Sequence, residues 1–262
     1  MFRPAFILLV FVSASGLAWG QEDLSYFRTV LDSDNTEAKR NVLLQIRELK
    51  SEEASRVATK ALRDRNEIVR ATAASSIIGL PPAEAVTVLT PLLRDRSPFV
   101  RTEAAYVLGN VGYTRSKLPL LVEILQKDAA KEARAAAAIS LGTILDVAAV
   151  GPLTAVFKKS PSEDNEFIRR SAARSIGKIA VTVRALLASH NAGQAFTGAT
   201  ETLIKVLQSS KESDDTRREA AIALGAIGHR DAIPTLNSHL NSPDYYLVEI
   251  CKKAIAAIEQ GQ

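Results

Sequence analysis

Cysteine, histidine and aromatic residues are scarce in this chain. The single cysteine, Cys251, excludes an intrachain disulfide and any metal site built from several cysteines. None of the three histidines, His190, His229 and His239, has a second histidine or a carboxylate at metal-ligand spacing on one helical turn, so no metal site is expected. Aromatics make up only 5% of the residues, and a core of alanine, leucine, isoleucine and valine suits short, close-packed helices.

Motifs that carry catalytic chemistry are also missing. The chain has no Gly-x-Ser-x-Gly sequence and no glycine-rich phosphate loop. Cys251 lies among Ile250, Ala254 and Ile255, which favours a buried, inert thiol over a nucleophile. We therefore expect no catalytic residue, no cofactor and no metal, and we predict that the protein is not an enzyme.

Charge is nearly balanced, and the first twenty residues differ from the rest. The formal net charge of +4 does not call for a polyanion, so nucleic acid is not an expected partner. Arg3 precedes an apolar run over residues 5–12, and small residues lead to Gly20. This order predicts a signal peptide over residues 1–20, with cleavage after Gly20 and release to the periplasm or the outside without a membrane anchor. An uncleaved anchor is the alternative, although the apolar run is short for spanning a bilayer.

One pattern of about ten residues returns along the chain, and its arginines are separated by 31, 33, 35 and 48 residues. Each copy places a pair of alanines or similar small residues after the arginine, and most copies then carry a Leu-Gly or Ile-Gly pair. The arginines of the five copies are Arg70, Arg101, Arg134, Arg169 and Arg217. Self-similarity at this period indicates stacked helix pairs, which expose a long surface suited to binding.

The third unit shows why the repeat has these letters. Ser97 and Pro98 fit a helix start, and the following apolar residues recur every three or four positions. Gly109 or Gly112 is expected to end this helix. The paired small residues, here Ala104 with its neighbour, suit a place where two helices approach closely.

This pattern resembles HEAT repeats, specifically the HEAT-like repeats of the phycobilin lyases, over residues 24 to 260. The resemblance implies an all-α protein, an α-solenoid (superhelix) of about six antiparallel helix pairs with terminal capping helices. The predicted domain covers residues 21–262. The deoxyhypusine hydroxylases, a HEAT-like metalloenzyme family, carry His-Glu pairs that this chain lacks, so the resemblance implies no metal site.

The resemblance also implies a structural ladder, in which each motif arginine bonds an aspartate of the preceding loop along the array. Three pairs have the six-residue spacing of the family: Asp64 with Arg70, Asp95 with Arg101, and Asp128 with Arg134. The corresponding spacings are shorter before Arg169, where Asp164 stands, and before Arg217, where Asp214 stands. We therefore expect the ladder to falter in the later repeats.

The ends and one interval depart from the repeat. A lone helix is expected around Phe27 and Leu31, followed by a first unit in which Lys39 replaces the arginine. In the last helix, Ala254 matches the pattern but the register is ambiguous. The 48-residue interval contains an excess near residues 181–198. This excess is either a longer first helix or an inserted loop, and its role is either partner binding or a neutral elaboration.

A partner-binding surface is expected on the inner face of the solenoid, which the family lines with the second helix of each pair. The residues off the apolar stripe of those helices form a mixed, slightly basic ridge that suits a segment with some negative charge, or else an ordinary solvated face. They are Arg56, Lys60, Thr87, Lys117, Glu123, Lys158, Lys205, Thr235 and His239. From the 181–198 interval, His190 and Phe196 are added as candidates.

The sequence therefore favours a non-catalytic scaffold or adaptor of the cell envelope that binds another protein. Two alternatives remain. The repeat resemblance alone allows a bilin-lyase-like protein that handles a chromophore, and a structural envelope component is the third possibility.

Overall fold

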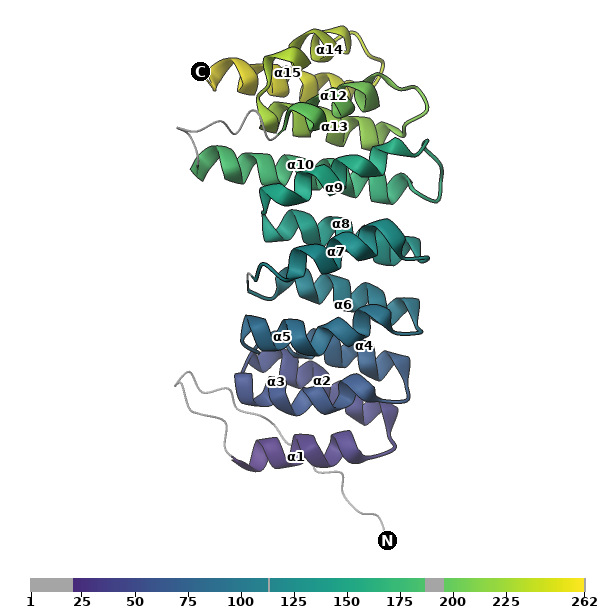
Figure 1. The fold of residues 1–262 in the computed structure, drawn as a ribbon, viewed down its shortest axis with the longest axis vertical. Coiled ribbons are helices and arrows are strands. Elements are labelled where there is room, and N and C mark those ends of the chain that lie inside the picture. Colours follow the sequence, from purple (N-terminus) through teal and green to yellow (C-terminus); the bar gives the residue numbers. More distant parts are fainter. Residues whose placement is uncertain (1–20, 113, 187–195, 262) are drawn as a thin grey trace.

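The computed structural model describes residues 21–112, 114–186 and 196–261. All regular elements within these ranges are helices, and they stack into an elongated, curved array (Figure 1). This array confirms the α-solenoid expected from the sequence. Within the described residues, six helix pairs follow one another, with α1 before the first pair and α15 after the last.

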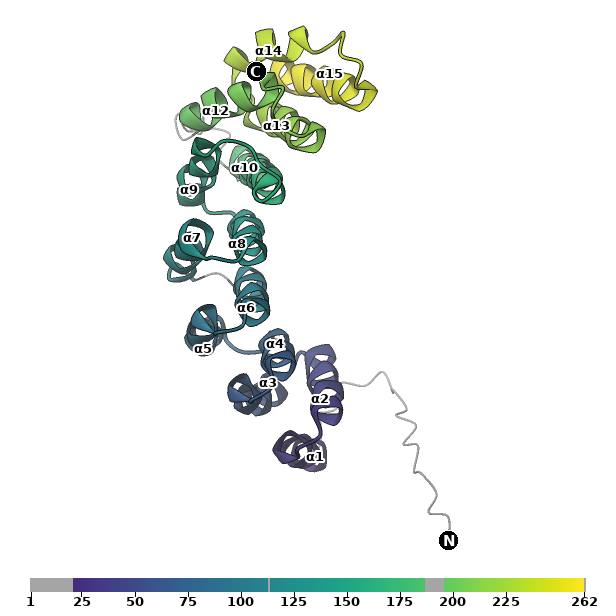
Figure 2. The ribbon, with the colours of Figure 1, turned by 90° about the vertical axis from the view of Figure 1, so that its right-hand side faces the viewer.

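The helices form two rows, which Figure 2 shows side by side. The row that contains the repeat arginines comprises α2 (Thr36–Leu49), α4 (Glu67–Ser76), α6 (Pro98–Asn110), α8 (Lys131–Ile144), α10 (Glu166–Leu186), α13 (Asp214–Ile227) and α15 (Tyr245–Gln260). The other row comprises α1 (Gln21–Asp32), α3 (Glu52–Ala58), α5 (Pro82–Leu89), α7 (Lys117–Lys127), α9 (Val150–Ala155), α12 (Thr197–Gln208) and α14 (Ile233–Ser238). Short 3₁₀ turns extend this second row at η1 (Thr59–Arg63), η2 (Thr90–Arg94), η3 (Val147–Ala149), η4 (Val156–Lys158) and η5 (Arg230–Ala232).

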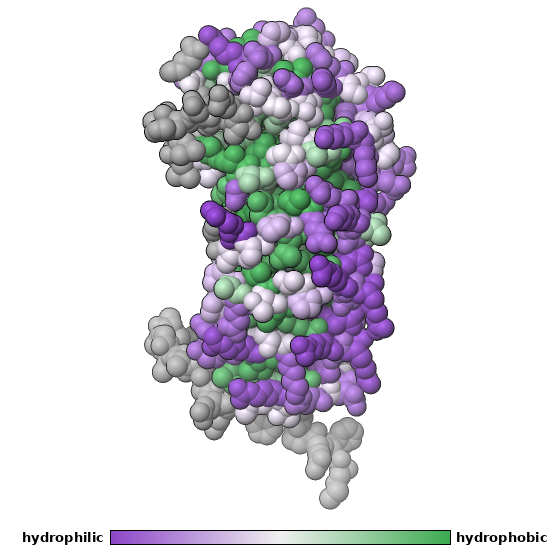
Figure 3. All heavy atoms as spheres, in the orientation of Figure 1, coloured by the Kyte–Doolittle hydropathy of each residue, from purple (hydrophilic) through white to green (hydrophobic). Residues whose placement is uncertain are grey.

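The array bends so that the arginine-bearing row lies on the concave side (Figure 2). We call this the inner row, and the other, whose face is seen in Figure 3, the outer row. The family resemblance predicted that the second helix of each pair lines the inner face, and the structure corrects this prediction. Consecutive inner helices pack directly on one another, whereas consecutive outer helices contact each other much less. The more tightly packed row is the shorter one, and it therefore lies on the inside of the bend.

Close packing of the inner row depends on glycines inside the helices. Gly109 or Gly112 was expected to end α6. Gly109 is buried within this helix, whose last residue is Asn110, and Gly112 lies two residues beyond that end. A Cβ on Gly109 would lie 2.5 Å from Oγ of Ser140 in the next inner helix. Gly177 has the same relation to Ala223, and Gly225 to Ala254. These glycines therefore allow helix–helix contact, and they do not serve as helix stops.

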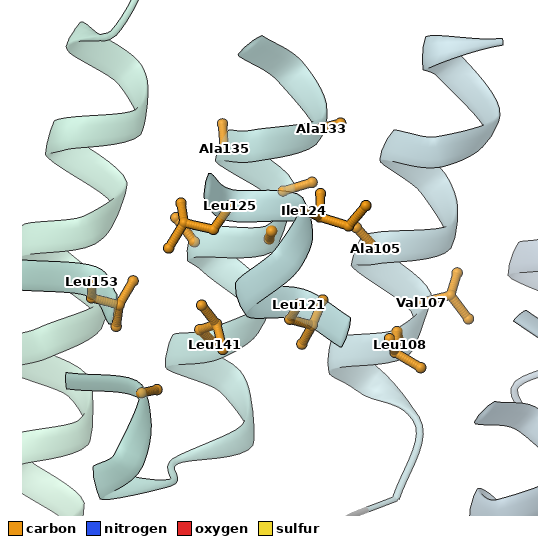
Figure 4. Close-up of a cluster of buried hydrophobic side chains, with 14 of the residues drawn as sticks. Ala105, Val107, Leu108, Leu121, Ile124, Leu125, Ala133, Ala135, Leu141 and Leu153 are labelled. Atoms are coloured by element: carbon orange, nitrogen blue, oxygen red, sulfur yellow. The ribbon is translucent and has the colours of Figure 1, made fainter. Parts of the chain in front are cut away.

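The core lies between the rows and runs the length of the array. Figure 4 shows one section of it, in which Leu121 of α7 lies between Leu108 of α6 and Leu141 of α8. These three leucines are buried, and so is Leu125, one turn further along α7. Because each outer helix fills the gap between two inner helices, every repeat depends on its neighbours for burial.

The ends and the long interval also take shape. Phe27 and Leu31 of α1 are buried against the first pair, as a capping helix requires. The long interval contains a longer first helix, because α10 extends to Leu186 and has 21 residues. Residues 187–195, including His190, lie outside the described residues. The proposed signal peptide over residues 1–20 lies outside them as well.

Candidate functional site

The turns between repeats hold a ladder of ion pairs. Nζ of Lys39 lies 2.7 Å from Oδ2 of Asp64. Arg70 binds Asp95 with two parallel hydrogen bonds of 2.7 and 2.8 Å, and Arg101 binds Asp128 with two of 2.8 Å. Such bidentate pairs fix both distance and orientation between neighbouring units.

The carboxylate partner differs from the sequence expectation. Arg101 binds the carboxylate of Asp128, which lies in the following turn, and not that of Asp95 six residues before it. Asp95 contributes its backbone carbonyl, which accepts from Nη1 of Arg101 at 2.9 Å. Each complete step therefore ties a turn to its own helix through a carbonyl and to the next turn through a carboxylate.

The ladder is interrupted at one repeat and continues beyond it. Arg134 donates to the carbonyl of Asp128 at 3.1 Å but has no carboxylate partner among the described residues. Arg169, where the sequence predicted weakening, forms a buried pair with Glu212, with 2.9 Å between Nε and Oε2. Glu212 lies in the turn after α12, so the short spacing before Arg169 could not predict this partner. Its side chain is one methylene longer than that of aspartate.

The last step shifts by one residue. Arg217 pairs with Asp214 on its own helix, and Arg218 makes the connection to Asp244 before α15, with hydrogen bonds of 2.9 and 3.0 Å. Asp244 also caps α15 by accepting from the backbone of Leu247. The ladder thus reaches both ends of the array and has its gap at Arg134.

Burial and hydrogen bonding act in opposite directions on these carboxylates. Burial alone would raise the pKa of Asp128, but the hydrogen bonds from Arg101 and from the backbone N–H of Ala130 outweigh it, so the pKa lies below its usual value. The pKa of Asp64 and that of Asp95 are lowered in the same way, by Lys39 and Arg70 respectively. The carboxylates are therefore charged partners of the ladder.

The predicted basic ridge lies on the outer row, and several of its charges are neutralised. Arg56 binds Glu84 of the next repeat at 3.2 and 3.1 Å, and Lys60 binds Asp32 of α1. Glu123 lies 3.7 Å from Arg94. Of the ridge lysines, Lys158 and Lys205 are exposed without an ion pair among the described residues. In Figure 3, hydrophilic residues gather along the right-hand edge, where the turns between repeats lie.

Two of the remaining candidates are not available to a partner. Lys117 is 1% exposed and donates from Nζ to the carbonyl of Val111 at 2.6 Å, and its burial lowers the pKa of its ammonium group. Phe196 is 2% exposed and belongs to the core before α12. Both side chains are therefore packing residues. The local sequence could not predict this, because their burial depends on how neighbouring repeats pack.

The inner row instead exposes large apolar side chains, a feature that the sequence analysis missed. Phe99 of α6 and Phe167 of α10 are 53% and 47% exposed. Each stands two residues before its repeat arginine, which is the signal that could have revealed them. Tyr106 and Phe167 also line one hollow of about 360 Å³ across α6, α8 and α10. Arg170 stacks over Phe167, with Cζ 5.1 Å from the ring centre.

An apolar groove of about 670 Å³ lies at the carboxyl-terminal end of the inner row. Val181 of α10 and Ile222 of α13 line it, and both are exposed. The other lining residues from α13 and α15 are Gly225, Ala226, Ile250, Lys253, Ala254 and Ala257. Volumes of this size are typical of binding sites, and Lys253 is the one charged side chain among the described lining residues.

Most cationic side chains on the three helices that line the groove already have a carboxylate partner. Among the described side chains of α10, α13 and α15, the paired cations are Arg169, Arg170, Arg174, Arg217, Arg218 and Lys252. Lys178 and Lys253 are exposed without such a partner in the described residues. Lys253 lines the groove, and Lys178 lies one helical turn before Val181.

The chemistry available at these sites is limited. In the described part of the chain, no group of histidine, cysteine, aspartate and glutamate side chains is arranged to hold a metal ion. Cys251 is buried, and burial raises the pKa of its thiol to about 11. None of the described helices has the length and apolarity needed to cross a membrane.

Paired helices, stacked in two rows and joined by an ion-pair ladder, define an α-solenoid repeat protein. The chain belongs to the HEAT repeat family, whose model matches residues 24–109, 55–142 and 180–259. No curated protein sequence matches it.

Two engineered proteins of solved structure share the fold, and a third structure is reported for comparison. One engineered protein is 21% identical with a TM-score of 0.59, over 91% of this chain and 69% of its own. A second engineered protein is 22% identical with a TM-score of 0.52, over 91% of this chain and 97% of its own. The complex of CpcE and CpcF of phycocyanin lyase from a Nostoc species is 19% identical with a TM-score of 0.48, over 97% of this chain and 100% of that chain. Identities this low show the fold alone.

Proposed function

We propose that this protein is a non-catalytic scaffold or adaptor that binds another protein on its inner row. The observation that carries the proposal is the exposure of Phe99, Phe167, Val181 and Ile222 along that row. Large apolar side chains that are exposed along one row of helices are typical of a protein interface. The outer row is a weaker candidate, because much of its charge is neutralised by its own ion pairs.

The proposed location is the cell envelope. It depends on the interpretation of residues 1–20 as a cleaved signal peptide. Intact-mass analysis of the protein recovered from its source cell tests this directly. A mature chain that begins at Gln21 supports the proposal, whereas a chain that retains residues 1–20 contradicts cleavage.

The binding surface is tested with affinity capture from envelope extract, using three baits. The first is the unaltered protein, and the second carries Phe99→Ser and Phe167→Ser on the inner row. The third, a matched control, carries Lys158→Ser and Lys205→Ser on the outer row. Deletion of residues 181–198 is unsuitable, because it removes part of α10 and the buried Val183 and Phe196.

The proposal expects a partner that is retained by the unaltered and outer-row baits and is lost from the inner-row bait. Retention by the inner-row bait with loss from the outer-row bait would move the site to the opposite face.

Measurements on the purified protein also distinguish the other candidate roles. Visible absorbance that copurifies would favour chromophore handling, and self-association on size exclusion without a captured partner would favour a structural component.

A further inference from the structure

The groove at the end of the inner row has features that restrict what binds there. We propose that the groove accepts one amphipathic helix of the partner protein, and that acidic residues flank the apolar face of this helix. This inference rests on the proposed function. Val181, Ile222 and Ile250 supply an apolar lining, and Lys178 and Lys253 supply positive charge beside it.

The floor of the groove explains why the ligand is a helix. Three helices line it, and each satisfies its backbone N–H and C=O groups internally, so no strand edge is offered. A partner segment in an apolar groove must therefore satisfy its own backbone, which a helix does. The small residues Gly225, Ala226 and Ala257 lie beside the larger Ile222 and Ile250, and this alternation leaves room for side chains from a facing helix.

Charge complementarity selects acidic flanks. On the three lining helices, arginines that could attract a carboxylate are already paired, as Arg174 is with Glu219 and Arg218 with Asp244. Lys178 and Lys253 have no such partner within the described residues. Because these two lysines are not already paired, they attract a carboxylate of the partner more strongly than a paired cation would. An amphipathic helix with basic flanks would instead meet like charge.

The test is a selection from a display library of helix-forming peptides against the purified protein, followed by titration of the leading peptide by fluorescence anisotropy. The inference expects enriched peptides with apolar residues at three- and four-residue spacing and an excess of aspartate and glutamate. Ile222→Asp, and separately Lys178→Glu with Lys253→Glu, should each weaken the leading peptide by about tenfold or more.

Matched controls come from the same molecule. Ile68 of α4 is 42% exposed, close to the 47% of Ile222, and lies on the same row away from the groove. Ile68→Asp should leave affinity within about twofold, as should Lys158→Glu with Lys205→Glu, which makes the same change in net charge. Val181→Asp serves as a second groove variant if Ile222→Asp fails to fold, and circular dichroism checks each variant.

Several results would overturn the inference. They are a selection without enriched peptides, an excess of basic peptides, or equal weakening by Ile68→Asp and Ile222→Asp. A dimer that Ile222→Asp dissociates would show that a second copy of the chain occupies the groove. A captured partner that still binds the groove variants would leave the proposed scaffold function standing and refute this site. If the unaltered bait captured no partner at all, the proposed scaffold function itself would be refuted.

Discussion

Gly109 of α6 and Ser140 of α8 occupy adjoining space so closely that no side chain fits on the glycine. A Cβ there would lie 2.5 Å from Oγ of Ser140, whose hydroxyl donates to the carbonyl of Ala105 at 2.8 Å. Both partners are buried, so neither can move into solvent. The absence of a side chain on Gly109 therefore allows α6 and α8 to lie this close.

Gly109→Ala should therefore destabilise the protein by about 1–3 kcal/mol, because the added methyl overpacks the contact. Gly198→Ala is the matched control. Apart from its chain neighbours, a Cβ on Gly198, in α12, would meet nothing within 4 Å, so the change should be neutral or stabilise by up to about 1 kcal/mol. Urea unfolding measures both. Equal destabilisation by the two changes would contradict the proposed role of the glycine.

Arg101→Ala should cost about 3 kcal/mol, because it leaves the carboxylate of Asp128 largely buried without its partner. Arg134→Ala removes one bond to a backbone carbonyl and no carboxylate pair, so it should cost only about 1 kcal/mol. Thermal and urea unfolding of both variants test the difference. If Arg134→Ala were the more damaging change, the location of the gap in the ladder would be incorrect.

The ladder also predicts how stability responds to acid. Because the pKa of Asp128 is lower in the folded chain than its ordinary value of 3.8, the unfolded chain binds the proton more readily. The contribution of this carboxylate is fully present above the unfolded pKa and is lost as pH falls through the folded pKa. Asp128→Asn should therefore destabilise the protein at pH 7, and this cost should shrink as the pH falls below 3.8 and through the lower folded pKa. Unfolding curves measured from pH 7 downward test this, and a cost that does not change with pH would refute the ion-pair explanation.

The thiol of Cys251 should be unreactive in the folded protein. It is buried, and its pKa is raised to about 11 because burial disfavours the thiolate. Iodoacetamide at pH 8 should leave the native protein unmodified and alkylate it fully in denaturant, as read by intact mass. Rapid alkylation of the folded protein would show that the last helix opens.

The sequence alone determined the helix pairs, their approximate number and the two caps. These features follow from residue spacing within about one repeat, such as the recurrence of Arg70, Arg101 and Arg134. Lys39 was also identified as a substitute for the arginine, and it does bind Asp64. The sequence can predict such local features because each unit contacts mainly its neighbours.

The tertiary structure decided everything that depends on how one repeat meets the next. It settled the register of α15, because Ala254 meets Gly225 as Ala223 meets Gly177. It also assigned the carboxylate of Arg101 to the following turn and placed the arginine-bearing helices on the concave side. These outcomes depend on side-chain volumes and charges brought together from different repeats, and the resulting bend accumulates along the whole array. The groove beside Ile222 exists for the same reason: three helices separated in sequence must pack before it forms.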